Sequence, residues 1–414
     1  MQHSPWICCQ LGAREHYAIP RALHQAGQLS LLITDAWVTP NSPLNSVPIK
    51  SIKSLCDRYH PDLKNAPIKA FTTRLISFEI QQRLQKTKDW DRMIARNRWF
   101  QAQVIKTLET IKFSNNQEPP ILFTYSYAAL EIIKYAKKRG WRTILGQIDP
   151  GIKEEEIVKS EQQKYPRLAP NWQPVPPNYW ESWRQECNLA DQIMVNSLWS
   201  KQLLEQANIK AEKIEIVPLV YEPPPDAANF TRTYPEKFTH ERPLRVLFLG
   251  LINLRKGIAA CLEAIEELTG EPIEFWFVGA IQIEIPEHLR NHPQIHWVGS
   301  VPRSETSCYY QQADVFLFPT LSDGFGLTQL EAQIWDLPLI SSCFCGNAVK
   351  DNINGFTLNL VSKHQIQKQI IFCLENPQML HQLSLKSLKL HSFDLSALNE
   401  SLKVAVSTNN YSNI

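Results

Sequence analysis

Two carboxylates and a glycine turn stand together in the stretch Ser322–Ala332. Asp323 and Glu331 are eight positions apart, and Gly324 and Gly326 lie between them. Eight residues is a little over two turns of an α-helix, so Glu331 would lie roughly below Asp323 on one helix face. One carboxylate could then bind a group at the glycine turn, and the other a group further along the same ligand.

An apolar run leads into this stretch and indicates how the chain positions it. Residues Val315–Phe318 are β-branched, aromatic or leucine and end at Pro319, a pattern that predicts a buried strand. The order strand, turn, helix would leave the backbone N–H groups of the helix start free to attract an anion. Gly324 and Gly326 would let the backbone approach that ligand closely. The sequence therefore predicts an anion site at this turn.

A pair of cations follows another apolar run. Arg255 and Lys256 come shortly after the strand predicted at Arg245–Leu249. The helix dipole disfavours positive charge at a helix start, so their position there favours a role in binding. Such cations would stabilise a leaving group on which negative charge grows in a transition state.

Strand and helix patterns alternate along the chain, which is typical of α/β domains with parallel sheets. A chain of 414 residues is too long for one ordinary core and predicts two domains. The expected strands are Trp6–Cys9, Leu29–Thr34, Ile121–Thr124, Thr143–Leu145, Gln192–Val195, Arg245–Leu249, Ile273–Val278, Ile295–Val298, Val315–Phe318 and Pro338–Ser341. The expected helices are Ala18–Leu23, Ala128–Arg139, Ser200–Ala207, Gly257–Leu268, Thr306–Gln312 and Leu327–Trp335, with a helical period also at 75–111.

A proline-rich, weakly periodic stretch divides the two halves. We predict an N-terminal domain at 1–225, a linker at 226–243 and a C-terminal domain at 244–385. Residues 386–414 are expected to form a helical segment that could pack back on the N-terminal domain. Ligands of open α/β sheets bind beyond the carboxyl ends of the strands, so two facing sheets would hold a ligand in the cleft between them.

The second half resembles the nucleotide-binding domain of a large family of retaining glycosyltransferases, glycosyl transferases group 1 or family 4, which have the two-domain GT-B fold. Asp323 and Glu331 match the spacing of the family's E-x7-E motif. Three further segments match in order: Gly250–Gly257 resembles G-R-L-x-x-x-K-G, and Ala313–Pro319 and Asp351–Phe356 are similar to family segments. The resemblance covers about residues 243–360. The N-terminal half resembles the family more weakly, through Gly12–Tyr17.

The resemblance implies transfer of a sugar from a nucleotide-sugar donor to an acceptor hydroxyl, with retention of anomeric configuration and without cofactor or metal. Lys256 and Arg255 would stabilise the diphosphate, Glu331 would accept hydrogen bonds from the ribose hydroxyls, and Asp323 would lie at the sugar and diphosphate. The acceptor would be a glycan, a lipid or a small molecule. The resemblance also implies that contact at the Asp323 end runs largely through the backbone of Gly324, Phe325 and Gly326. The residues expected to line the donor are Gly12, Gly250, Gly324, Phe325, Gly326, Leu327 and Thr328.

The sequence departs from the family at three places. Asp323 replaces a glutamate and is shorter by about one bond length (~1.5 Å). The family arginine after Gly250 is Leu251, for which Arg255 is a plausible substitute.

A histidine expected after a middle strand of the N-terminal half is the third departure. Gln147 or Asp149 could take its place, and His16 is an alternative polar contact near the Gly12 turn. These departures leave a second hypothesis open, a degenerate GT-B protein that binds a nucleotide sugar or glycan without turnover. A related epimerase or phosphorylase is a third, although no pyridoxal lysine context is visible.

Composition narrows the partners. The formal net charge of +2 does not suggest a nucleic-acid binder. Residues 1–100 are nevertheless basic, with 14 Lys/Arg against 7 Asp/Glu. Within them, Arg83–Arg98 combines cations with Trp90, Met93 and Ile94. It could lie on an anionic membrane surface, or it could be a solvated amphipathic helix.

The cysteine pattern and the absence of long apolar runs indicate a compartment. Nothing approaches the roughly 20 apolar residues of a membrane span, and the N-terminus lacks the features of a secretory signal. The nine cysteines are scattered without a C-x-x-C pair, as expected for reduced thiols. Cys343 and Cys345 have no matching second pair, so no metal site is predicted. These observations predict a cytoplasmic protein, which could be peripheral at the inner membrane face. The oligomeric state is not indicated.

Overall fold

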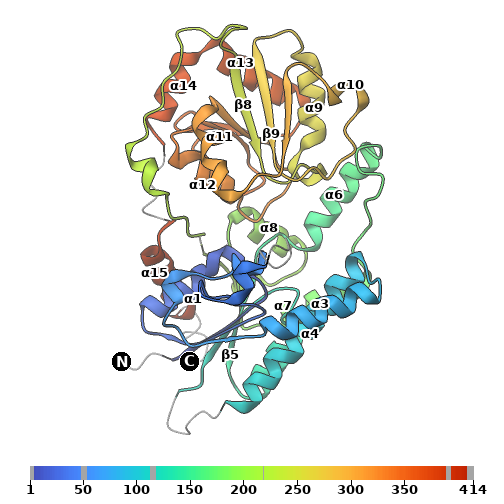
Figure 1. Cartoon of the computed structure of the whole chain (residues 1–414), viewed down its shortest axis with the longest axis vertical. Helices are drawn as coiled ribbons and strands as arrows, with labels where there is room; N and C mark the ends of the chain where they lie inside the picture. Colours follow the sequence, from blue (N-terminus) through green and yellow to red (C-terminus); the bar gives the residue numbers. More distant parts are fainter. Residues whose placement is uncertain (1–3, 48–53, 112–117, 218, 388–392, 408–414) are drawn as a thin grey trace.

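The chain folds into two lobes, each built on a parallel sheet covered by helices (Figure 1). The computed structural model describes residues 4–47, 54–111, 118–217, 219–387 and 393–407. All ten expected strands are present. The predicted α/β class with two Rossmann-like domains is confirmed, and the two sheets contain three further strands that the apolar runs did not indicate.

The N-terminal sheet has seven strands in the order β3-β2-β1-β4-β5-β6-β7. Its strands are β1 (Trp6–Gln10), β2 (Leu29–Thr34), β3 (Ile68–Ala70), β4 (Ile121–Tyr125), β5 (Arg142–Gln147), β6 (Gln192–Val195) and β7 (Ile214–Ile216). Every pairing is parallel. The central strands are buried on both faces, which explains their continuous apolar sequences.

Helices cover both faces of this sheet. They are α1 (Ala18–Gln25), α3 (Thr72–Leu84), α4 (Asp89–Thr110), α5 (Leu130–Lys138), α6 (Ile152–Lys164), α7 (Pro177–Leu189) and α8 (Leu198–Gln206). The helical period at 75–111 is therefore two helices. They are separated at Gln85–Lys88, where Lys86 has a left-handed φ of 54°.

The C-terminal sheet has six strands in the order β10-β9-β8-β11-β12-β13. Its strands are β8 (Leu244–Leu249), β9 (Ile273–Val278), β10 (Ile295–Gly299), β11 (Val315–Phe318), β12 (Leu339–Ser342) and β13 (Gly355–Leu358). Its helices are α9 (Ile258–Glu267), α10 (Glu287–Arg290), α11 (Thr306–Gln312), α12 (Leu327–Ile334), α13 (Lys363–Glu375) and α14 (Pro377–Ser384).

The segment 226–243, expected to be a linker, is packed against the C-terminal domain. Arg232 is 5% exposed, and its guanidinium donates to the carbonyl oxygens of Tyr310 and Trp335 at 2.6 and 2.8 Å. Phe238 is buried in the core of the same domain. Because these contacts fix its backbone, the segment behaves as an outer layer of that domain.

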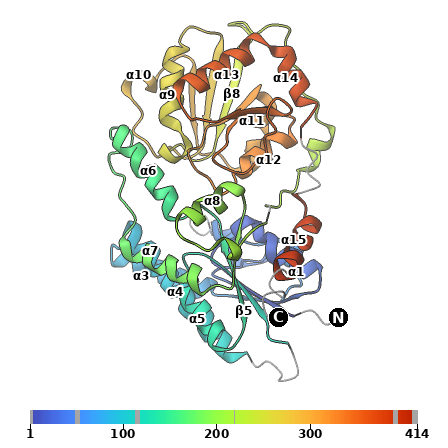
Figure 2. The same ribbon diagram turned by 180° about the vertical axis from the view of Figure 1, so that it is seen from behind.

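The last helix, α15 (Leu395–Ser407), returns to the N-terminal lobe. Leu395, Leu398 and Leu402 are buried in one apolar cluster with Leu23 of α1. Figures 1 and 2 both show α15 beside α1, far from the sheet that precedes it in the sequence. The chain therefore crosses between the lobes twice.

Each sheet changes its winding direction between two neighbouring strands, β1 and β4 in the first and β8 and β11 in the second. Ligands of such sheets bind outside the carboxyl ends of strands at these points. The α6 and α8 helices lie between the lobes there (Figure 2), and α6 contacts the short 3-10 helix η6 (Leu254–Lys256) after β8. The loops that meet at this junction carry most of the residues selected from the sequence.

Candidate active site

The two carboxylates of the E-x7-E-like motif lie on different elements. The helix α12 begins at Leu327, with Gly326 as its N-cap. Asp323 therefore lies in the loop after β11, and the expectation that it shares a helix face with Glu331 is wrong. Four residues, Asp323 to Gly326, precede the first residue of the helix. The eight-residue spacing of Asp323 and Glu331 therefore does not correspond to two helical turns.

Asp323 is bound to the two cations after β8. The Lys256 ammonium donates to its Oδ2 and lies 4.6 Å from the centre of the Phe318 ring. The Arg255 Nη1 is 3.5 Å from the same Oδ2. Burial acts to raise the pKa of Asp323, but Lys256 and Arg255 outweigh it and hold that pKa below its usual value. The structure thus brings together three of the four predicted catalytic residues.

A carboxylate that the sequence analysis did not select completes this cluster. Glu154, from the first turn of α6 in the other domain, accepts a hydrogen bond from Ser322 Oγ at 2.9 Å, and its Oε1 is 3.7 Å from Arg255 Nε. Burial raises the pKa of Glu154 to about 8, against the effect of Arg255 and reinforced by Asp149 and Asp323. The only feature of the sequence that could have indicated Glu154 is a run of three glutamates. Such a run is more often typical of a solvated helix face.

The first glycine of the turn serves a contact between the domains. A Cβ built at Gly324 would lie 1.9 Å from the carbonyl oxygen of Ile148, at the end of β5. Its lack of a side chain therefore admits the backbone of the other domain, whereas we had expected it to admit a ligand. Gly326 has a φ of 86° and Gly250 a φ of 143°, backbone conformations that favour glycine.

Two residues expected to line the donor point their side chains into an apolar core. Phe325 is 5% exposed and packs with Leu219, Leu330 and Ala348, and Leu327 lies against the same cluster. Only the backbone of Phe325 remains for a ligand, whereas the Leu327 side chain is partly exposed. Thr328 is partly buried in the first turn of α12, where amide groups have no partner within the helix.

Glu331 lies one helical turn further along α12. Its Oε2 accepts a hydrogen bond from the buried hydroxyl of Tyr310 at 2.7 Å. A carboxylate can accept about four hydrogen bonds, so this contact orients Glu331 and leaves capacity for ligand hydroxyls. Tyr310 was not selected from the sequence.

The turn after β1 is held by a buried acid. The amide of Gly12 donates to Asp35 Oδ1 at 2.9 Å. Further along the same turn, Glu15, His16 and Tyr17 all have left-handed φ values of 50–58°. Such values are strained for residues with a side chain. Such strain persists only where surrounding contacts fix the backbone, so this turn has a defined shape at the junction.

His16 forms a contact between the domains. Both of its ring nitrogens lie near Arg303 Nη1, with Nδ1 at 3.1 Å. Burial and the charge of Arg303 lower the pKa of His16 to about 4, so the neutral ring accepts from the guanidinium. Arg303, in the loop after β10, was not selected from the sequence.

Gln147 and Asp149 have separate roles. Gln147 is 1% exposed, and its Nε2 donates to Asp149 Oδ1 at 3.0 Å and to the Tyr127 hydroxyl at the same distance. Asp149 lines a cavity of about 200 Å³ together with Trp172 and Tyr179. The structure therefore favours Asp149 as the group that meets a ligand and makes Gln147 a residue that positions it.

Two Rossmann-like domains that face each other at their switch points define the GT-B fold. Solved structures support this class. The chain superposes on that of Alr3699/HepE from Anabaena, a structure in complex with UDP and glucose, with a TM-score of 0.61 at 13% identity, covering 97% of this chain and 99% of that one. At such low identity the likeness establishes the fold alone.

A family match is found for the second domain. Residues 243–376 match the family model of glycosyl transferases group 1, which confirms the resemblance predicted for this part of the chain. A 41.2 kDa protein in the cps region of Klebsiella pneumoniae is 22% identical over 43% of this chain and 50% of its own length. The amylovoran biosynthesis glycosyltransferase AmsK of Erwinia amylovora is 24% identical over 40% of this chain and 42% of its own length. The chain thus spans half or less of these curated relatives.

Proposed function

We propose that this protein transfers a sugar from a nucleotide-sugar donor to an acceptor hydroxyl, with retention of anomeric configuration and without a metal ion. The observation that carries the proposal is the Arg255–Lys256 pair, which follows β8 and faces the glycine turn before α12 at the domain junction. Departure of a nucleoside diphosphate builds negative charge on its oxygens. Two fixed cations and a helix start supply the opposite charge where it grows.

Retention is supported by the resemblance of the motifs to a retaining family. Metal independence is supported by the charge available from the protein, since Arg255 and Lys256 can neutralise a diphosphate together. Among the described residues, no group of three or more His, Cys, Asp or Glu side chains is arranged to hold a metal ion. UDP-glucose is the first donor to test, because the Anabaena Alr3699/HepE protein was solved in complex with it.

Release of nucleoside diphosphate from a panel of UDP-, GDP- and ADP-sugars tests the proposal. We expect release with one donor class, unchanged by EDTA, and a product whose anomeric configuration by NMR matches the donor. Loss of activity in EDTA, restored by a divalent cation, would refute metal independence. An inverted product would refute retention.

Binding without turnover is the alternative function. The specific observation in its favour is that Asp323, which replaces the longer family glutamate, is bonded to Lys256 and lies near Arg255. A donor that raises the thermal midpoint but releases no diphosphate with any acceptor would support this alternative over transfer.

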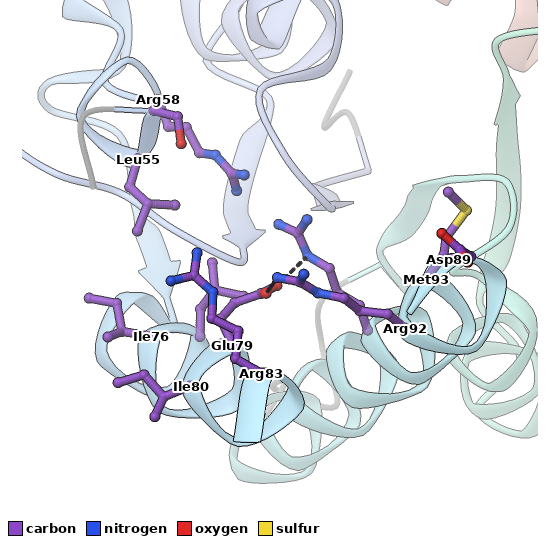
Figure 3. A pocket seen from close by; sticks show the side chains of 12 residues that line it. Leu55, Arg58, Ile76, Glu79, Ile80, Arg83, Asp89, Arg92 and Met93 are labelled. Atoms are coloured by element: carbon purple, nitrogen blue, oxygen red, sulfur yellow. Dashed lines mark hydrogen bonds and ion pairs between the residues drawn. The ribbon is translucent and has the colours of Figure 1, made fainter. Parts of the chain in front are cut away.

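The acceptor side has a feature suited to an anionic membrane surface. A cavity of about 520 Å³ lies between α3 and α4, with an apolar wall that includes Ile76 and Ile80 and another wall of arginines, two of which pair with Glu79 (Figure 3). Ile80, Leu84 and Met93 beside it are 53%, 79% and 46% exposed. We propose that this face makes a peripheral membrane contact on the cytoplasmic side, which would suit a lipid acceptor.

Flotation with liposomes tests the membrane contact. We expect the protein to float with anionic vesicles at low salt and to be released from them at high salt. It should not bind neutral vesicles. Ile80→Glu should abolish flotation without loss of fold. A wild-type protein that stays in solution with anionic vesicles at low salt refutes the contact. No helix in the described ranges is long and apolar enough to cross a membrane.

A further inference from the structure

The two cations expected to hold the donor diphosphate are occupied by carboxylates. Lys256 is bonded to Asp323, and Arg255 lies 3.5 Å from Asp323 and 3.7 Å from Glu154. A diphosphate can bind these cations only if the carboxylates yield part of their contact. Asp323 is fixed by its backbone, whose amide donates to the Phe344 carbonyl at 3.0 Å. Glu154 is the member that reaches in from the other domain.

The groups around Glu154 disfavour its ionised form when another anion binds beside it. Arg255 faces it from η6, Asp323 and Ser322 face it from the loop after β11, and Asp149 faces it from the loop before α6. The Glu154 side chain is only 16% exposed, so water screens these charges weakly. The favourable charge of Arg255 is therefore opposed by the negative charges of Asp149 and Asp323. A diphosphate arriving at Arg255 adds to the negative side and favours the neutral form of Glu154.

We propose that a nucleotide-sugar diphosphate binds at Arg255 and Lys256 with Glu154 in its protonated form, so that binding takes up one proton at a pH where Glu154 is ionised in the free protein. The proton comes from solvent and adds to a carboxylate oxygen, and no covalent bond to the ligand forms. The neutral carboxyl then carries an O–H group that can donate to the diphosphate, while its former partner Arg255 turns its charge to the ligand. This inference rests on the proposed function, since it assumes a diphosphate donor.

The protonation that this requires is not costly near neutral pH. Burial already raises the pKa of Glu154 to about 8, so the carboxyl is largely neutral at pH 7. A bound anion raises that pKa further. Because the protonated form of Glu154 binds the donor, donor affinity stays constant well below pH 8. It falls as the pH rises through 8, by at most tenfold per pH unit.

Calorimetric titration with UDP-glucose, and with GDP-mannose and ADP-glucose as alternative probes, tests the coupling between pH 6.5 and 8.5. For the wild type we expect donor affinity at pH 8.5 to be about fourfold weaker than at pH 6.5. The binding enthalpy at pH 8.5 should depend on the ionisation enthalpy of the buffer, as proton uptake requires. In Glu154→Gln both effects should vanish, and binding at pH 8.5 should be tighter than in the wild type.

Glu156→Gln is the matched control. Glu156 is on the same helix, is 56% exposed and pairs with Lys153 on the helix surface, so its variant should retain the full pH and buffer dependence. Glu186 also titrates in this range, because burial raises its pKa to about 7, and the Glu154→Gln variant keeps that residue.

Three outcomes would overturn the inference. Donor binding by the wild type without buffer dependence refutes the proton uptake and leaves the proposed function standing. Equal pH dependence in wild type and Glu154→Gln assigns the proton to another group. Failure of the folded wild type to bind any of the three donors overturns the proposed function together with this inference. The buffer dependence is measured on the wild type, so the coupling is tested even if the variant folds poorly.

Discussion

Asp323 and Lys256 form an ion pair in which the length of the acid matters. The pair is mostly buried, with the two side chains 16% and 11% exposed. A glutamate at this position would carry its carboxylate about one bond length (~1.5 Å) further. The shorter side chain instead keeps the carboxylate close to its own loop, where the amide of Phe325 also lowers its pKa. The aspartate at position 323, in place of the glutamate of the family motif, therefore favours a role for this carboxylate in positioning Lys256.

Replacing Lys256 tests this pair. We expect Lys256→Ala to lower kcat/KM for the donor about 100-fold, because a fixed positive charge at the leaving group is lost. It should also lower the free energy of unfolding by about 3 kcal/mol, because Asp323 is left buried without its partner. Steady-state kinetics and urea denaturation measure the two effects. Lys363→Ala, which breaks a solvent-exposed surface pair with Glu267, should leave both stability and kinetics almost unchanged.

A double variant separates the two roles of Lys256. Lys256→Ala combined with Asp323→Asn removes both charges, so much of the lost stability should return while the activity stays low. If activity returns with stability, Lys256 acts on the fold alone and the assignment to the diphosphate is wrong.

The sequence predicted those site residues that lie in short segments directly after strands. Arg255, Lys256 and Asp323 were selected because each follows an apolar run, and β8 and β11 are neighbours in the sheet, so these loops meet. Glu154 and Arg303 were missed because their contacts depend on how two domains face each other, which local sequence does not encode. The side-chain directions of Phe325 and Gln147 could not be predicted, because residue type alone does not show which way a side chain points.

The start of α5 depends on an acid from another helix. Glu186 of α7 is 1% exposed, and its carboxylate accepts from the amides of Tyr127, Ala129 and Leu130 at 2.7, 2.9 and 3.1 Å. It thus satisfies donors that a helix start leaves without partners. No side chain at the N-cap of α5 makes this bond.

Glu186→Ala should therefore be costly. We expect a loss of about 2–4 kcal/mol in the free energy of unfolding, since several buried amides lose their acceptor. Urea denaturation monitored by circular dichroism measures it. Glu181→Ala, on an exposed position of the same helix, should change stability by no more than about 0.5 kcal/mol. Equal effects of the two variants would show that water replaces the carboxylate at no cost.

The return of α15 to the N-terminal lobe can be tested within that helix. Leu398 is 3% exposed and Val404 is 52% exposed. We expect Leu398→Ala to cost about 2–4 kcal/mol, because it leaves a cavity in the cluster around α1, and Val404→Ala to cost less than about 0.5 kcal/mol. A small loss at Leu398 in urea denaturation would mean that the helix contributes little to the N-terminal core.

The elements that the sequence did not predict share physical causes. The strands β3 and β7 have only three residues each and lie at the sheet edges, so neither offers a run long enough to recognise. The helix α6 is strongly charged and buries only Glu161 among its residues, so it lacks an apolar stripe. It is stabilised where it bridges the domains, a setting visible only in three dimensions.

The two domains are held together by several contacts around the junction. His16 meets Arg303, Glu154 meets Ser322, and Leu168 lies in the core of the C-terminal domain although it belongs to the N-terminal half of the chain. Ser200 Oγ donates to the Gly324 carbonyl at 3.3 Å. Since the residues of both domains that we propose to bind the donor lie among these contacts, the spacing of the domains would set the shape of that site.

Gly324 is the position where this spacing is most easily changed. In Gly324→Ala the new Cβ would meet the Ile148 carbonyl oxygen at 1.9 Å, too close for any side-chain carbon. Both partners are backbone, so the loop and the β5 end must separate. We expect a larger radius of gyration by small-angle scattering and donor binding weaker by about tenfold, which corresponds to about 1.4 kcal/mol, within the range for overpacking.

Gly140→Ala provides the comparison for Gly324→Ala. Gly140 has a φ of 70° and open space around a built Cβ, so its variant should lose about 1 kcal/mol of stability through backbone strain. It should leave the scattering curve and donor affinity unchanged, because no residue of the other domain is near. If Gly324→Ala behaves in the same way, the domains are not set by this contact and the glycine turn is free to move with the ligand. If it separates the domains and weakens the donor together, the closeness of Gly324 to Ile148 is what places the cations of one domain against the carboxylate of the other.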